Sequence, residues 1–140
     1  MNVRQYTTAD RAALIALWHA TFPHEPPHDP PHNAPSMMID AKLAVDDMIF
    51  VAESFDEITG ACMAGYDGHR GWLYAIAVRQ DNRRGGAGSA LVKHAMHALQ
   101  ARGCVKVNLQ IRAANKSVAA FYESLGFVIE ERLSMGALLK

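Results

Sequence analysis

This chain of 140 residues has little cysteine, no long hydrophobic run and no net charge. Each of these absences excludes or disfavours a class of protein. Only Cys62 and Cys104 are present, without a CxxC spacing, which favours buried structural thiols over a disulfide framework or a zinc site. No apolar run reaches about 18 residues and no leader-like segment opens the chain, so we expect no membrane span and a cytoplasmic protein. A formal net charge of zero gives no general case for nucleic-acid or membrane partners.

Proline is missing everywhere except in residues 22–35, which contain all six prolines of the chain. Because proline fixes φ and lacks an N–H, this segment is predicted to be a semi-rigid connector. His24, His28 and His32 recur there every four residues. The prolines remove the helix on which that spacing would gather ligands, so we expect no metal. A plain surface loop and a lid over a substrate both stay open as roles for the segment.

Charge is uneven along the chain although its total is zero. Residues 70–106 carry seven basic side chains against Asp81, whereas residues 36–57 carry six acidic ones against Lys42. The basic part shows no interleaved aromatic residues of the kind that RNA-binding surfaces use. A polyanionic cofactor therefore explains it better than RNA.

A length of 140 residues suits one domain over residues 1–140, and half of the residues are hydrophobic, which is enough for a core. The predicted helices and strands make it an α/β (α+β) domain. Thr7 is expected to cap the first helix, with Asp10 at its third position, and Asp67-Gly68 is expected to form a hairpin turn. Helices are predicted after Thr7 to about residue 21 and over residues 36–45, 89–102 and 116–125. Strands are predicted over residues 2–6, 48–53, 58–66, 72–78, 105–111, 127–131 and 133–139.

The most informative stretch lies between the strand 72–78 and the helix that follows it. Two arginines, Arg83 and Arg84, precede three glycines within four residues. A helix start leaves its first N–H groups unpaired, and glycine lets an anion approach the backbone closely, so this turn is predicted to bind phosphate. The spacing fits neither a Walker loop nor a dinucleotide fingerprint. A glycine-rich surface loop without a ligand is the alternative.

Arg83-x-x-Gly86-x-Gly88 resembles the pyrophosphate-binding signature of the GCN5-related N-acetyltransferase (GNAT) family, in its small single-domain bacterial form. A second block agrees, because Asn115 is followed after six residues by Tyr122-Glu123-x-x-Gly126-Phe127, as in that family. The resemblance implies a mixed, mostly antiparallel, twisted sheet of six to seven strands, flanked by about four helices and splayed at the cofactor strands.

The resemblance also implies the chemistry, which is direct transfer of an acetyl group from acetyl-CoA, a co-substrate, to an amine of a small molecule, peptide or protein. A main-chain N–H near Ala75–Ile76 would polarise the thioester, and Tyr122 would protonate the leaving thiolate. A core aromatic is the alternative for Tyr122, and a helix cap is the alternative for Asn115. The cofactor-binding residues implied are Ile76, Ala77, Val78, Arg83, Arg84, Gly85, Gly86, Ala87, Gly88, Ser89, Asn115 and Tyr122.

The general base is where the chain departs from its best-matched pattern. The segment around Asn115 and Tyr122 resembles the ribosomal-protein N-terminal acetyltransferases, which carry a glutamate base where this chain has Gln110. Replacements could be Glu53, Asp67, His69 or a base-linked water, although Asp67 and His69 also suit plain turn chemistry. Gln110 itself fits a polar strand residue equally well.

Two further function classes compete with the acetyltransferase. Gln110 keeps open a non-catalytic acyl-CoA-binding or regulatory module of the same fold, and the basic zone keeps open a nucleotide- or RNA-binding domain. A lysine amine with a pKa of about 10.4 costs roughly 4–5 kcal/mol to deprotonate at pH 7, whereas an α-amine near 8 costs about 1.4 kcal/mol. Without a strong base, low-pKa amines are therefore the easier acceptors. The sequence names neither the acceptor nor the oligomeric state, a homodimer included.

Overall fold

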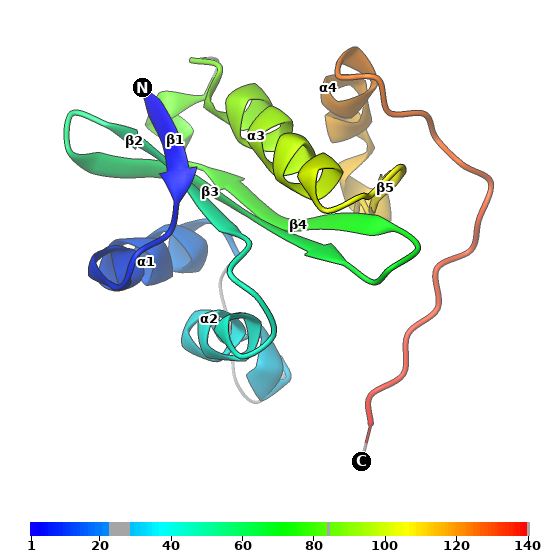
Figure 1. The fold of residues 1–140 in the computed structure, drawn as a ribbon, viewed down its shortest axis with the longest axis horizontal. Coiled ribbons are helices and arrows are strands. Elements are labelled where there is room, and N and C mark those ends of the chain that lie inside the picture. Colours follow the sequence, from blue (N-terminus) through cyan, green and yellow to red (C-terminus); the bar gives the residue numbers. More distant parts are fainter. Residues whose placement is uncertain (23–28, 84, 140) are drawn as a thin grey trace. The chain divides into compact units, whose positions relative to one another are not determined.

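The computed structural model describes residues 1–22, 29–83 and 85–139, and Figure 1 shows the elements they form. These residues divide into two compact units, Met1–Leu109 and Gln110–Lys140. His24 and His28 of the proline-rich segment and Arg84 of the glycine-rich turn lie outside the described residues.

The first unit is built on one five-stranded sheet with the strands in chain order, β1-β2-β3-β4-β5. The first four strands pair antiparallel, and β5 pairs parallel to β4. This confirms the mixed, mostly antiparallel sheet. The strands are β1 (Asn2–Gln5), β2 (Ile49–Ser54), β3 (Glu57–Tyr66), β4 (Gly71–Val78) and β5 (Val107–Leu109).

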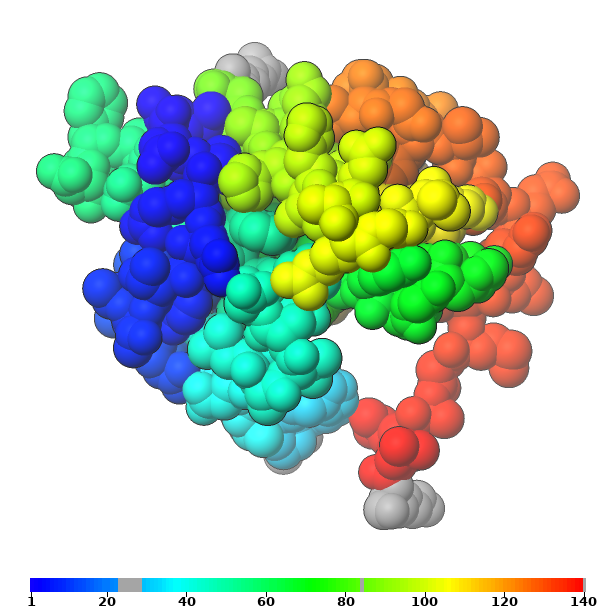
Figure 2. All heavy atoms as spheres, in the orientation of Figure 1, coloured from blue at the N-terminus to red at the C-terminus, as the bar shows by residue number. Residues whose placement is uncertain are grey.

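Helices cover both faces of this sheet, with α1 (Arg11–Thr21) and α2 (Pro35–Leu43) on one side and α3 (Ala87–Ala101) on the other (Figure 1). In Figure 2 the blue atoms of the N-terminal segment, which includes α1, lie next to the cyan atoms of α2 at the surface of the first unit. Because strand side chains alternate between faces, Val51 and Met63 join Leu14 and Trp18 of α1 in one core cluster. On the other face, Phe50 packs edge-on against His94 of α3, with ring centroids 4.9 Å apart.

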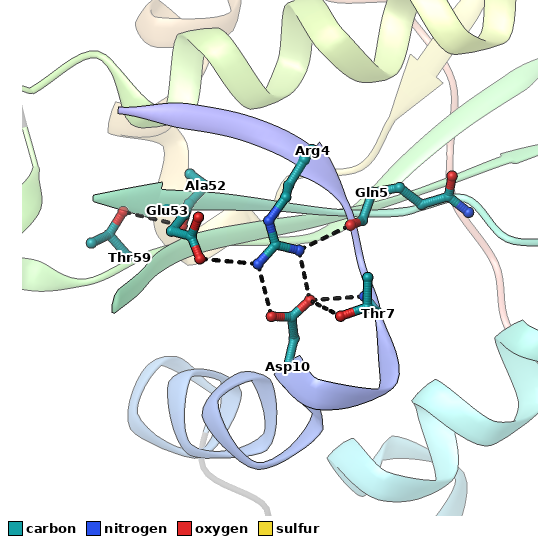
Figure 3. A network of polar contacts seen from close by, with 7 residues as sticks. All are labelled: Arg4, Gln5, Thr7, Asp10, Ala52, Glu53 and Thr59. Atoms are coloured by element: carbon teal, nitrogen blue, oxygen red, sulfur yellow. Dashed lines mark hydrogen bonds and ion pairs between the residues drawn. The ribbon is translucent and has the colours of Figure 1, made fainter. Parts of the chain in front are cut away.

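A partly buried ion pair fixes the start of α1 against the sheet (Figure 3). Arg4 of β1 donates two hydrogen bonds to the Asp10 carboxylate, at 2.8 and 2.9 Å, and a third to Glu53 of β2 at 3.1 Å. The Thr7 N–H and hydroxyl donate to the same carboxylate at 2.8 and 3.2 Å. The predicted pairing of Thr7 with Asp10 is therefore confirmed, on the short 3₁₀ turn η1 (Thr8–Asp10) that leads into α1.

The turns follow the predicted residues closely. The Asp67 carboxylate accepts the N–H groups of His69 and Arg70 at 2.8 and 2.7 Å, and Gly68 has φ +91°, which completes the β3–β4 hairpin. Gly103, with φ +90°, follows the end of α3 as expected of a helix stop. A 3₁₀ turn, η2 (Pro31–Asn33), precedes α2, which begins at Pro35 rather than after a Ser36 cap. Proline suits that first helical position because its N–H would have no helical partner there.

The second unit contains a 3₁₀ segment, η4 (Ala113–Val118), followed by α4 (Ala119–Ser124). The two predicted strands over residues 127–131 and 133–139 are wrong, because no described residue after Ser124 forms a strand. An alternating pattern indicates a side that could be buried, but it supplies no strand to pair with. Leu133 and Leu139 are accordingly 94% and 97% exposed. The sheet therefore has five strands in the described residues, rather than six to seven.

Among the helices that the structure describes, none has both the length and the apolar character that crossing a membrane requires.

Candidate active site

The glycine-rich turn connects β4 to α3 through a 3₁₀ turn, η3 (Gln80–Asn82). Gly86 stands immediately before α3 and has φ +85°, a left-handed conformation that strains any residue with a side chain. Its carbonyl accepts the Ala90 N–H at 3.0 Å, the first hydrogen bond of the helix. The N–H groups of residues 87–89 therefore precede the helical ladder, where helix geometry leaves them available to an anion.

Arginine side chains next to this turn differ in how they are engaged. Arg79 is held by Glu57 and Asp81, each at 3.0 Å, so its charge is already neutralised. Arg83 is exposed, and its side chain has no ion pair within the described ranges. Arg83 is therefore the described arginine best able to meet an incoming phosphate, and Arg84 lies outside the described residues.

The strand β4 is interrupted by a bulge at Ala75. Ala61 pairs with Ala77 whereas Met63 pairs with Tyr74. The chain therefore advances three residues along β4 over a stretch in which β3 advances two. Ala75 takes up the extra residue with φ +52°, which costs an L-residue about 1–2 kcal/mol. Its carbonyl accepts the Trp18 indole N–H of α1 at 3.0 Å. A bulge of this kind redirects the main-chain groups that follow it.

The opposite edge of β4 is only partly paired. Its first three residues pair with β5, from Gly71 opposite Val107 to Leu73 opposite Leu109. Among the described residues, no strand pairs with β4 on this side beyond Leu73. The Arg79 N–H bonds the Thr59 carbonyl of β3 at 2.8 Å, so by alternation Ala77 also faces β3. Ile76 and Val78 thus present main-chain groups at the free edge, which is where an extended ligand can add hydrogen bonds.

The second unit shows why the Tyr-Glu-x-x-Gly-Phe spacing recurs as a block. Gly126, with φ +97°, reverses the chain after α4, and the Phe127 N–H returns to the Tyr122 carbonyl at 3.1 Å. The Phe127 ring then packs edge-on against the Tyr122 ring, with centroids 5.8 Å apart, and Phe121 does the same at 4.9 Å. Two rings thus fix the position of the half-buried Tyr122 on α4.

Asn115 and Gln110 belong to the same unit. Asn115 is exposed and leaves helical geometry inside η4, with φ −116° and ψ 37°, so the chain kinks there. The Gln110 amide donates a hydrogen bond to the Ser134 hydroxyl at 2.6 Å. Gln110 therefore has a structural partner, and its amide cannot accept a proton as a base would.

Two of the other proposed bases, Glu53 and Asp67, have structural partners of their own. Glu53 is paired with Arg4 (Figure 3). The Asp67 carboxylate accepts two turn N–H groups and the Trp72 indole N–H, and these hydrogen bonds hold its pKa below the ordinary value. Asp67 and His69 also lie beyond Gly71, which is four residues or about 13 Å along β4 from Ala75. Asp67 and His69 therefore lie at the opposite end of β4 from Val78.

A cavity of about 940 Å³ lies in the first unit, between one side of α1, the β2–β3 turn and the end of β4. Val78 and Arg83 line it, together with Glu53. That volume is at the upper end of the range of small-molecule pockets, which is about 300–1,000 Å³. In the described ranges, no three His, Cys, Asp or Glu side chains gather in a way that could hold a metal ion.

Sequence reasoning missed Trp18 and the left-handed conformation of Ala75. Trp18 reads as an ordinary apolar helix residue, and alanine gives no signal of positive φ in a strand. The only available hint was an indole N–H that needs a partner when buried, as it is here, where Trp18 is 1% exposed.

Comparison with known proteins agrees with the geometry. A family model described as "Acetyltransferase (GNAT) family" matches residues 11–127, most of the chain and parts of both units. An acetyltransferase from Pectobacterium atrosepticum is 37% identical over 140 residues, which covers 99% of this chain and 96% of that protein.

Solved structures share the fold at low sequence identity. The apo aminoglycoside 6′-N-acetyltransferase AAC(6′)-IG from Acinetobacter haemolyticus has a TM-score of 0.80 at 18% identity, covering 100% of this chain and 99% of that one. AAC(6′)-Iy, solved in complex with the bisubstrate analogue CoA-S-monomethyl-acetylneamine, has a TM-score of 0.78 at 17% identity, covering 99% and 98%. At these identities the likeness shows the fold alone.

Proposed function

Because this chain belongs to the acetyltransferase (GNAT) family and is an N-acetyltransferase, we propose that it binds acetyl-CoA at the start of α3. Members of the family use acetyl-CoA as the acetyl donor. The supporting observation is the left-handed Gly86, which ends the turn directly before α3, where the first N–H groups have no partner within the helix. The pyrophosphate would accept hydrogen bonds from the backbone of residues 84–89, and the Arg83 and Arg84 side chains would add charge.

The pantetheine arm would run along the edge of β4 over Ile76, Ala77 and Val78 and pair with the main chain of Ile76 and Val78. The absence of a partner strand there in the described residues supports this assignment. A main-chain N–H next to the bulge at Ala75 would then donate to the thioester oxygen, where negative charge develops during attack.

In the proposed reaction, the amine nitrogen attacks the carbonyl carbon, and the carbon–sulfur bond breaks as the new carbon–nitrogen bond forms. The thiolate takes the hydroxyl proton of Tyr122, and the amine loses its proton to water. Asn115 would hydrogen-bond the cofactor arm. The fixed ring of Tyr122 supports its role, since a proton donor must be held in one orientation.

We further propose acceptors whose amines have a low pKa, such as α-amines of small molecules or peptides. Glu53 is paired with Arg4, the Asp67 carboxylate holds its turn, and the Gln110 amide cannot accept a proton, which supports an acceptor that needs no strong base. An α-amine with a pKa near 8 reaches its reactive form at a cost of about 1.4 kcal/mol at pH 7, against roughly 4–5 kcal/mol for lysine.

Two broader assignments complete the proposal. The family model spans the boundary after Leu109, which supports a single catalytic domain made of both units. Two buried free cysteines suit a reducing compartment, which supports a cytoplasmic enzyme.

The test is release of free CoA from acetyl-CoA with a panel of amines. Tyr122→Phe should lower kcat by about 100-fold or more while leaving CoA affinity intact, because only the donated proton is lost. Tyr66→Phe is the matched control, since its hydroxyl donates to two main-chain carbonyls, that of Gly68 at the β3–β4 turn at 3.3 Å and that of Gly103 after α3 at 3.5 Å. Binding of CoA without turnover on any amine would instead favour a non-catalytic module.

A further inference from the structure

One hydrogen bond joins α1 to the most strained residue of β4. The Trp18 indole N–H donates to the Ala75 carbonyl at 3.0 Å, and Ala75 has φ +52° in the middle of the strand. Trp18 is 1% exposed, so its indole N–H cannot turn to water without opening the core, and Ala75 is half-buried. A buried N–H or carbonyl left without a partner is costly, so the bond favours the bulged conformation over a regular strand.

The bulge matters because a strand alternates the side to which its main-chain groups point. One extra residue shifts that alternation for every residue after it, here Ile76 to Val78. Ala77 still pairs with Ala61 and stays 3% exposed in the core. The bulge therefore changes the direction of the edge N–H groups while the packing beneath them is retained.

We propose that Trp18 is a positioning residue, which holds the Ala75 bulge so that the N–H after it is aimed at the thioester oxygen. This rests on the proposed function, since it assumes that the edge of β4 receives the acetyl-CoA arm. Trp18 touches no reacting atom in this account and acts through the Ala75 carbonyl. The position of α1 thereby affects the hydrogen bond that polarises the thioester.

The first variant is Trp18→Phe, which keeps an aromatic ring and removes the donor. The expected result is a fall in kcat of about five- to tenfold, the effect of one net hydrogen bond, with CoA affinity changed less than twofold. Trp72→Phe is the control, because it removes the other indole N–H of the same strand, which bonds Asp67 at 3.3 Å at the turn. Its kcat should equal that of the unchanged enzyme.

A second change separates positioning from packing. Glycine adopts positive φ without strain, so Ala75→Gly in the Trp18→Phe background should recover at least threefold in kcat. A merely structural loss would not be recovered by a substitution that adds no packing. If Ala75→Gly changes kcat by the same factor with and without Trp18→Phe, the two substitutions act independently and the proposal is overturned.

Replacing Trp18 by β-(3-benzothienyl)alanine, which puts sulfur where the N–H is, covers the case in which Trp18→Phe does not fold. NMR shifts of the Ala75 and Ile76 amides give a readout without turnover, and they should move in this variant but not in Trp72→Phe. Unmoved amides would overturn the inference. If kcat is unchanged in the Trp18 variants while Tyr122→Phe shows its expected defect, the inference is overturned and the proposed function stands. If the unsubstituted enzyme shows no turnover, the proposed function is overturned, and with it the inference that rests on it.

Discussion

Asp10→Asn should destabilise the protein strongly, because every group around this carboxylate is a donor. Arg4 donates twice and Thr7 twice, at 2.8–3.2 Å, and Asp10 is 7% exposed (Figure 3). The asparagine side chain has one acceptor oxygen in place of two. Its NH₂ group would face one of the Arg4 or Thr7 donors, and that donor would lose its hydrogen-bond acceptor. Because the Asp10 carboxylate is buried and the Arg4 side chain is 29% exposed, the expected decrease in the free energy of unfolding is about 2–4 kcal/mol.

Urea unfolding followed by circular dichroism measures this, with Asp40→Asn as the matched control. Asp40 makes the same two-bond contact with Arg11, at 2.7 and 3.3 Å, but its side chain is 65% exposed. The control should therefore lose about 0–1 kcal/mol. If both variants lose the same free energy of unfolding, burial does not set the strength of the Asp10 contact and the reasoning is refuted.

The pH dependence gives a second check on Asp10. Hydrogen bonds from Arg4, the largest cause, lower the pKa of Asp10 against the opposing effect of burial. A lowered folded-state pKa means that the stabilisation is complete above the unfolded value of about 3.9 and is lost as the pH falls through the folded value. The stability difference between the unchanged protein and Asp10→Asn should thus be full at neutral pH and shrink below about pH 4.

Three further predictions concern the turn, a cysteine and the acceptor. Gly86→Ala should lower the free energy of unfolding by about 1 kcal/mol in urea, while Gly136→Ala, at a glycine without positive φ, should cost less; equal costs would contradict the left-handed turn. Burial raises the pKa of Cys62 to about 12, so a thiol reagent near neutral pH should label it only after urea unfolding, and labelling in the folded state would contradict its burial. CoA release should be faster with peptide α-amines than with lysine side chains at neutral pH, and the reverse order would show that a strong base exists.

The features predicted well from sequence are those whose residue types allow few alternatives. Asp67-Gly68 made the hairpin turn, and Gly103 followed the end of α3, because left-handed positions favour glycine. The strand–turn–helix arrangement around Gly86 was predictable for the same reason. Local chemistry determined each of these.

The features that sequence reasoning missed depend on contacts between distant residues. Nothing in Ala75 signals positive φ, because the compensating bond comes from Trp18, 57 residues away. The strands predicted over residues 127–139 failed because alternation does not provide a pairing partner. Gln110 could be recognised as an unsuitable base from its amide, but not as the partner of Ser134.

The central claim is that the first N–H groups of α3 bind the diphosphate of the cofactor. The most direct measurement compares amide NMR shifts of residues 85–89 during titration with CoA and with pantetheine, which lacks the diphosphate. The account predicts large shifts with CoA and little change with pantetheine. Amides that stay unmoved at saturating CoA would contradict it.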